Sequence, residues 1–119
     1  MQNTEKIYVE SSLPDFSDQV LKASFERPVI VDFWADWCSP CLVIAPVLEK
    51  VAREYEESLL LVKVEVDADE NMKLAGRYKL RGFPTIILFL DGEEAGRFSG
   101  ARPYHEIKNF LDQHIAEQG

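Results

Sequence analysis

The chain has 119 residues, of which 46% are hydrophobic, and this is enough for one domain with its own core and no cross-links. Its 13 basic and 21 acidic side chains give a formal net charge of -8, the opposite of the positive surface that binds nucleic acid phosphates or anionic membranes. These numbers predict a single domain over residues 1–119, with residues 1–6 as a loose N-terminal extension, and they argue against nucleic acid and membranes as partners.

The first fourteen residues are polar and charged, without the apolar run of a signal peptide. No later stretch approaches the roughly 20 apolar residues that a membrane-spanning helix needs. We therefore expect a cytoplasmic protein, and with one small domain we expect it to be a monomer.

Hydrophobic periodicity predicts nine elements in the order β-α-β-α-β-α-β-β-α. The expected ranges are a short strand at 7–9, a helix at 16–25, a strand at 29–34, a helix at 40–55, a strand at 59–66, a helix at 71–78, a hairpin of 85–90 and 95–99, and a last helix at 104–115. In the first helix the apolar residues that recur at helical spacing are Phe16, Val20, Leu21 and Phe25. The helices are long enough to connect parallel strands, and the hairpin, which turns at Asp91-Gly92, adds antiparallel ones. The fold class is therefore α/β, with a mixed central sheet and helices on both faces.

The two cysteines, Cys38 and Cys41, lie where the strand at 29–34 turns into the helix at 40–55. A bridge between them would close a loop too small to stabilise a fold, which favours a bond that opens and closes. Unpaired N–H groups and the positive dipole at a helix start favour a thiolate at Cys38, and we expect the sulfur of Cys38 to be accessible. Pro40 suits the first helical turn. Cys41, one turn on, is expected to be less exposed and to resolve a mixed disulfide.

Two other readings of the cysteines stay open from the residues alone. They could be ordinary buried side chains, or half of a zinc site. Zinc needs about four ligands, and the histidines, His105 and His114, both lie on the last helix, far along the chain from the cysteines. We therefore predict no metal.

Several separate blocks of the sequence resemble the thioredoxin family, over residues 16 to 115. These blocks are Val31-Asp32-Phe33-Trp34-Ala35, Trp37-Cys38-Ser39-Pro40-Cys41, Ala45-Pro46, Val66-Asp67, Gly82-Phe83-Pro84-Thr85, Asp91-Gly92 and Gly100-Ala101. The resemblance implies a thioredoxin fold with a five-stranded sheet of order 1-3-2-4-5 flanked by four helices. It also implies a thiol–disulfide oxidoreductase that reduces protein disulfides without a bound cofactor, with electrons supplied by thioredoxin reductase.

The resemblance implies roles for four side chains. Cys38 matches the attacking cysteine and Cys41 the resolving one. Asp32 matches a buried carboxylate that moves the proton of the resolving thiol through water, and burial would raise its pKa into a useful range. Lys63, on the neighbouring strand in that fold, could be its charge partner. The alternatives are an Asp32 at a strand edge facing water and a simply exposed Lys63.

The resemblance also implies a docking surface around Cys38. Phe83-Pro84 matches a cis-proline segment whose backbone pairs with an extended substrate peptide. The surface would consist of Trp37, Ser39, Pro40, Phe83, Pro84, Gly100 and Ala101. The alternative for Trp37 and Phe83 is that both are core aromatic residues.

Two positions depart from the family pattern. Ser39 replaces the usual glycine between the cysteines, and Leu42 stands where a basic residue is common. Both bear on the thiol pKa and the redox potential. Two alternative functions stay open, namely a disulfide oxidase or isomerase, and a non-catalytic binding module.

Overall fold

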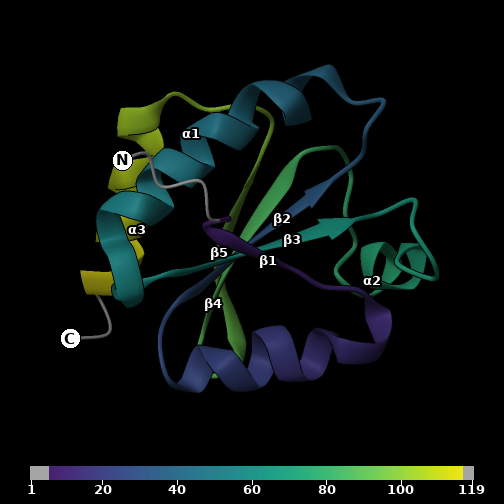
Figure 1. Cartoon of the computed structure of the whole chain (residues 1–119), viewed down its shortest axis with the longest axis horizontal. Helices are drawn as coiled ribbons and strands as arrows, with labels where there is room; N and C mark the ends of the chain where they lie inside the picture. The colour runs from purple at the N-terminus through teal and green to yellow at the C-terminus, as the bar shows by residue number, and fades with distance from the viewer. Residues whose placement is uncertain (1–5, 117–119) are drawn as a thin grey trace.

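A five-stranded mixed sheet forms the centre of the computed structural model, which describes residues 6–116. The strands are β1 (Tyr8–Glu10), β2 (Val29–Trp34), β3 (Leu60–Glu65), β4 (Thr85–Leu90) and β5 (Glu93–Ser99). Their spatial order is β1-β3-β2-β4-β5, which confirms the predicted order 1-3-2-4-5 (Figure 1). The expected loose extension at residues 1–6 lies outside the described residues, except for Lys6.

The direction of each strand follows from its connection. β3 pairs with β1 and β2 in parallel, as expected for strands joined by helical crossovers. β4 pairs with β2 and β5 in antiparallel fashion. The two-residue loop between β4 and β5 has positive φ at Asp91 and Gly92, 52° and 83°, which is the backbone that a tight hairpin turn requires.

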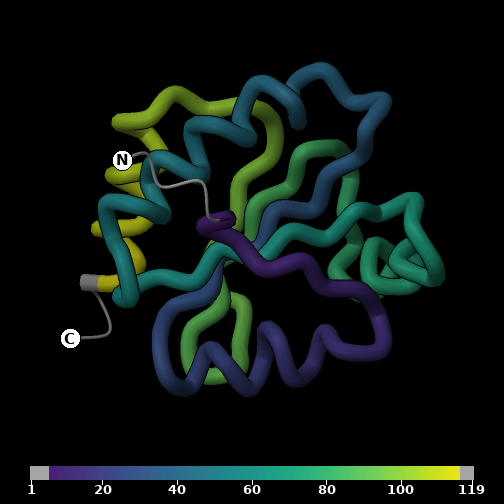
Figure 2. Tube along the Cα trace, viewed as in Figure 1, coloured from purple at the N-terminus to yellow at the C-terminus, as the bar shows by residue number. Residues whose placement is uncertain are grey.

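Helical segments cover both faces of the sheet (Figures 1 and 2). On one face lie α1 (Ser39–Tyr55) and α3 (Tyr104–Ala116), whose apolar side chains pack with those of the sheet in one buried cluster. The other face is covered by α2 (Met72–Arg77) and by the helical segment between β1 and β2. Alternate residues of β2 divide between the two clusters, so this central strand is buried on both sides.

The first helical segment differs from the α-helix predicted at residues 16–25. It consists of a 3₁₀ turn at Leu13–Asp15, a π-helix at Ser17–Lys22 and a second 3₁₀ turn at Ala23–Phe25. These turns have a different number of residues per turn from an α-helix, so side chains drift out of the 3.6-residue phase. Phe25, predicted on the inner face, is consequently exposed, and its ring lies against Gly92.

Within residues 6–116, no helix combines the length and the apolar character needed to cross a membrane.

Candidate active site

The cysteine pair sits at the junction of β2 and α1, at the helix start. Cys38 is the N-cap residue of α1, with extended backbone, and Cys41 lies in the first turn. The two form a disulfide. The backbone N–H of Cys41 donates a hydrogen bond to the Cys38 sulfur at 3.2 Å. One N–H group of the helix start therefore points at the Cys38 sulfur, in line with the sequence prediction, and it would stabilise the Cys38 thiolate once the disulfide is reduced.

The cysteines are more buried than expected. Cys38 is 4% exposed and Cys41 is 2% exposed, and both belong to the core cluster on the α2 face. Cys38 remains the more exposed of the pair, as predicted, but the expectation of an openly accessible Cys38 is not met. The physical reason is tertiary, because side chains from the core cluster pack around the helix start. A partner must therefore reach a Cys38 side chain that is almost fully buried.

Asp32 lies inside the sheet, not at an edge facing water. It sits in the middle of β2, between Lys63 of β3 and Ile86 of β4 in the register, and is 1% exposed. Neither carboxylate oxygen has a hydrogen-bond partner among the described residues. Burial raises the pKa of Asp32 from 3.8 to about 7, and the positive charge of Lys63 opposes this rise. A carboxyl group with this pKa can exchange a proton near neutral pH.

Asp32 points to the face of the sheet that α1 and α3 cover, and α1 carries Cys41 in its first turn, although the Cys41 side chain itself packs with the cluster on the α2 side. Alternating residues of a strand point to opposite faces. Ile30, two residues before Asp32, packs in the cluster formed with α1 and α3, so Asp32 points to that same side.

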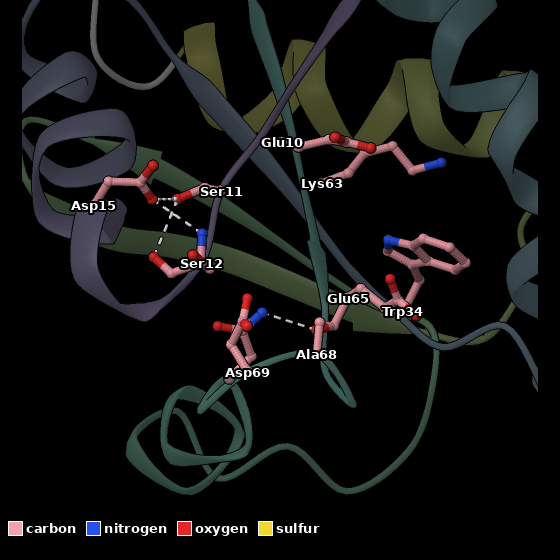
Figure 3. A pocket seen from close by; sticks show the side chains of 10 residues that line it. Glu10, Ser11, Ser12, Asp15, Trp34, Lys63, Glu65, Ala68 and Asp69 are labelled. Carbon is pink, nitrogen blue, oxygen red and sulfur yellow. Dashed lines mark hydrogen bonds between the residues drawn. The ribbon is translucent and has the colours of Figure 1, made fainter.

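Lys63 is the direct neighbour of Asp32 across the β2–β3 pairing, and it is half-buried. Its ammonium lies 4.9 Å from the centroid of the Tyr8 ring and 5.0 Å from the centroid of the Trp34 ring. Figure 3 shows Lys63 and Trp34 lining one pocket at this end of the sheet. Within residues 6–116 Lys63 forms no ion pair of 4 Å or less with Asp32. The positive charge of Lys63 therefore lowers the pKa of Asp32 as a nearby charge and not through a direct ion pair.

Trp37 is a surface residue rather than a core aromatic residue. Its side chain is 65% exposed, beside Cys38 in the chain. The indole N–H donates a hydrogen bond to the carboxylate of Asp67, and the ring meets Phe83 edge to face at a centroid distance of 6.0 Å. Phe83 is half-buried and packs against the core. Asp67 and Phe83 thus hold the exposed indole ring of Trp37 in one orientation next to Cys38 in the chain.

The remaining residues of the predicted docking surface come from the start of α1, the loop before β4 and the loop after β5. The Phe83–Pro84 peptide bond is cis, as the resemblance implies, and Pro84 is buried. The backbone N–H of Gly100 donates to the Pro84 carbonyl at 2.9 Å, which joins the end of β5 to the proline segment. Ser39, Pro40 and Ala101 are exposed.

The structure adds residues that the sequence analysis did not single out. Asp67 orients Trp37, and the available signal was its position two residues after β3, whose end meets the same sheet edge as the end of β2. Val43 is 62% exposed beside Leu42 at 56%, so α1 presents apolar side chains to solvent just after the cysteines. Helical periodicity could have predicted this, because both positions lie off the inner face.

Among residues 6–116, no group of three or more histidine, cysteine or acidic side chains is arranged to hold a metal ion. A disulfide closed between the cap and first turn of a helix, at the end of the strand that holds a buried carboxyl group, defines a thiol–disulfide oxidoreductase with a thioredoxin fold.

Comparison with known proteins gives the same result. The family model described as Thioredoxin matches residues 7–113. Thioredoxin from Pseudomonas aeruginosa is 44% identical over 100 residues, which is 84% of this chain and 89% of that protein. Thioredoxin C-2 from Corynebacterium nephridii is 42% identical over 107 residues, 90% of this chain and 95% of its own length. Thioredoxin 1 from Synechococcus elongatus is 41% identical, covering 84% and 90%. The chain belongs to the thioredoxin family.

Proposed function

We propose that this oxidoreductase works as a general protein-disulfide reductase, with Cys38 as the attacking residue, Cys41 as the resolving residue and Asp32 as the proton acceptor. The observation that carries the proposal is the hydrogen bond from the Cys41 N–H to the Cys38 sulfur at the start of α1. A helix start lowers the pKa of a thiol by favouring the thiolate, which is the attacking species. The proposal applies to the cysteines of the reduced protein.

The exchange has two steps in which atoms and electrons balance. The Cys38 thiolate attacks one sulfur of a substrate disulfide, a Cys38–substrate disulfide forms, and the other substrate sulfur leaves as a thiolate. The Cys41 thiol then gives up its proton and attacks the Cys38 sulfur, which releases the second substrate thiol. The Cys38–Cys41 disulfide of this structure is the product, and the substrate has gained two electrons. No cofactor takes part in these two steps.

Asp32 is suited to accept the proton of Cys41. It faces α1, its oxygens are unpaired within the described residues, and its pKa is about 7. A base is most effective when its pKa lies near the working pH. Lys63 keeps that pKa from rising further, because a nearby positive charge favours the carboxylate.

The docking surface supports a protein substrate. Trp37 and Phe83 give an apolar contact area near Cys38, and Leu42 and Val43 extend it along α1. An extended peptide could add to the segment before Pro84 as a strand, with Ser39, Pro40, Gly100 and Ala101 at its margins. Because Cys38 is only 4% exposed, disulfides that lie on flexible or exposed loops should be the better substrates.

The electron donor, the cellular compartment and the oligomeric state that we propose follow from this function. A dithiol that reduces many proteins must be reduced again, and we assign this to a thioredoxin reductase. A reducing compartment is needed to keep the pair as thiols, which favours the cytoplasm. Because both cysteines and Asp32 lie in one chain, one copy completes the site, and we expect a monomer.

Insulin reduction driven by dithiothreitol tests the function. The wild-type protein should accelerate the reduction, Cys38→Ser should abolish the acceleration, and Cys41→Ser should accumulate a mixed disulfide through Cys38. Activity in Cys38→Ser would contradict the assignment. A redox titration against glutathione tests the direction, because about 30 mV corresponds to a tenfold change in the equilibrium. A potential more oxidising than that of glutathione would indicate an oxidase instead.

A further inference from the structure

We propose that Tyr8 is a positioning residue for the proton site: together with Trp34 it holds the Lys63 ammonium between two aromatic rings beside Asp32. This inference rests on the proposed role of Asp32 as proton acceptor, which it deepens. Tyr8 is on the edge strand β1 and Trp34 on β2, on either side of β3, which carries Lys63.

The distances support a cation–π contact on both sides. The Lys63 nitrogen lies 4.9 Å from the Tyr8 centroid and 5.0 Å from the Trp34 centroid, both inside the range of about 6 Å for this interaction. By strand alternation the three side chains start from the same side of the sheet, because Tyr8 is paired with Leu61 and Trp34 with Glu65, each two residues from Lys63. Trp34, the last residue of β2, also packs against the cluster on the α2 side. The rings therefore hold a lysine that has no ion pair with Asp32.

The charged groups around Lys63 show why its ammonium must be held by the two rings of Tyr8 and Trp34, which we call the clamp. Carboxylates lie around Lys63, with Glu10 as its register partner on β1 and Glu65 two residues along β3 (Figure 3). A freed ammonium would move outward toward these groups and water, because moving inward to Asp32 would cost desolvation of a charge. The charged groups that line this end of the sheet or contact Tyr8 are Lys6, Glu10, Asp15, Lys63, Glu65 and Asp69.

Loss of the clamp should therefore raise the pKa of Asp32. The positive charge of Lys63 favours the ionised carboxyl group, and an ammonium further away favours it less. We expect Tyr8→Leu, which keeps an apolar side chain but removes the ring, to raise the pKa of Asp32 by about 0.3 to 0.7 pH unit. Tyr8→Phe keeps the ring and is the matched control, with no change expected.

The pKa is measured from the ¹³C chemical shift of the Asp32 carboxyl carbon in the oxidised protein, where the cysteines do not titrate. Lys63→Met should raise it more than Tyr8→Leu does, and adding Tyr8→Leu to Lys63→Met should change nothing further. A downward shift in Tyr8→Leu, an equal shift in Tyr8→Phe, or a shift that persists without Lys63 would overturn the proposal.

Two further measurements distinguish a failure of the Tyr8 proposal from a failure of the proposed proton role of Asp32. The pH at which insulin reduction accelerates should rise with the pKa of Asp32 in Tyr8→Leu. A pKa that moves without any change in the rate profile would reject the proton role of Asp32 and leave the clamp standing. If Tyr8→Leu does not fold, the clamp is tested by NMR on the wild-type protein, because two flanking rings should shift the ε-methylene protons of Lys63 upfield. Random-coil positions for these protons would reject the clamp.

Discussion

Replacing Asp32 by asparagine should stabilise the protein above neutral pH. The folded state raises the pKa of this carboxyl group from 3.8 to about 7, so the folded chain holds a proton that the unfolded chain has released. Raising the pH through this window therefore favours unfolding. At about 1.4 kcal/mol per pH unit, the penalty reaches about 4 kcal/mol above pH 8. Between pH 5 and pH 8 the free energy of unfolding of the wild-type protein should fall by about 2 to 3 kcal/mol because of Asp32.

Asp32→Asn removes the charge but leaves a buried amide without partners, which costs about 1 to 3 kcal/mol at every pH. The informative quantity is therefore the difference between variant and wild type at two pH values, in which the constant cost cancels. Urea unfolding of the oxidised proteins at pH 5 and pH 8 measures it. The stability advantage of Asp32→Asn should grow by about 2 to 3 kcal/mol from the lower to the higher pH. Asp36→Asn, at an exposed site nearby, is the control.

The same variant should slow insulin reduction near neutral pH, because Cys41 loses its proton acceptor. A stability difference that is the same at both pH values would refute the raised pKa of Asp32. An unchanged rate between pH 6 and pH 9, with the stability difference as expected, would refute only the proton role.

Three substitutions test packing and one hydrogen bond away from the site. A Cβ on Gly96 would lie 2.5 Å from the His114 ring nitrogen, so Gly96→Ala should lower the free energy of unfolding by about 1 to 3 kcal/mol, measured in urea. At Gly76 nothing lies within 4 Å of the added carbon, so Gly76→Ala should be neutral or stabilising by up to about 1 kcal/mol. Equal effects of the two substitutions would contradict this packing. Tyr55 of α1 donates a hydrogen bond to Asp112 of α3, so Tyr55→Phe should lower the free energy of unfolding by about 1 kcal/mol, and no loss would mean that water replaces the bond.

The sequence by itself determined the fold class, the strand order through the family resemblance, and the placement of the cysteines at a helix start. These features depend on local patterns. Apolar residues repeat with the period of a strand or a helix, and Pro40 directly follows the β2–α1 junction. The first helical segment was the exception, because its mixture of 3₁₀ and π turns leaves no distinct periodicity, and Phe25 was assigned to the wrong side.

Only the tertiary structure decided how the site works electrostatically. The pKa of Asp32 depends on its burial between two strands, and the position of Lys63 depends on rings from β1 and β2. The orientation of Trp37 depends on Asp67, thirty residues away in the chain. Such contacts join residues that are distant in sequence, and the energy of a charge or ring depends on its distance to a partner and on the water between them. A one-dimensional pattern contains neither quantity.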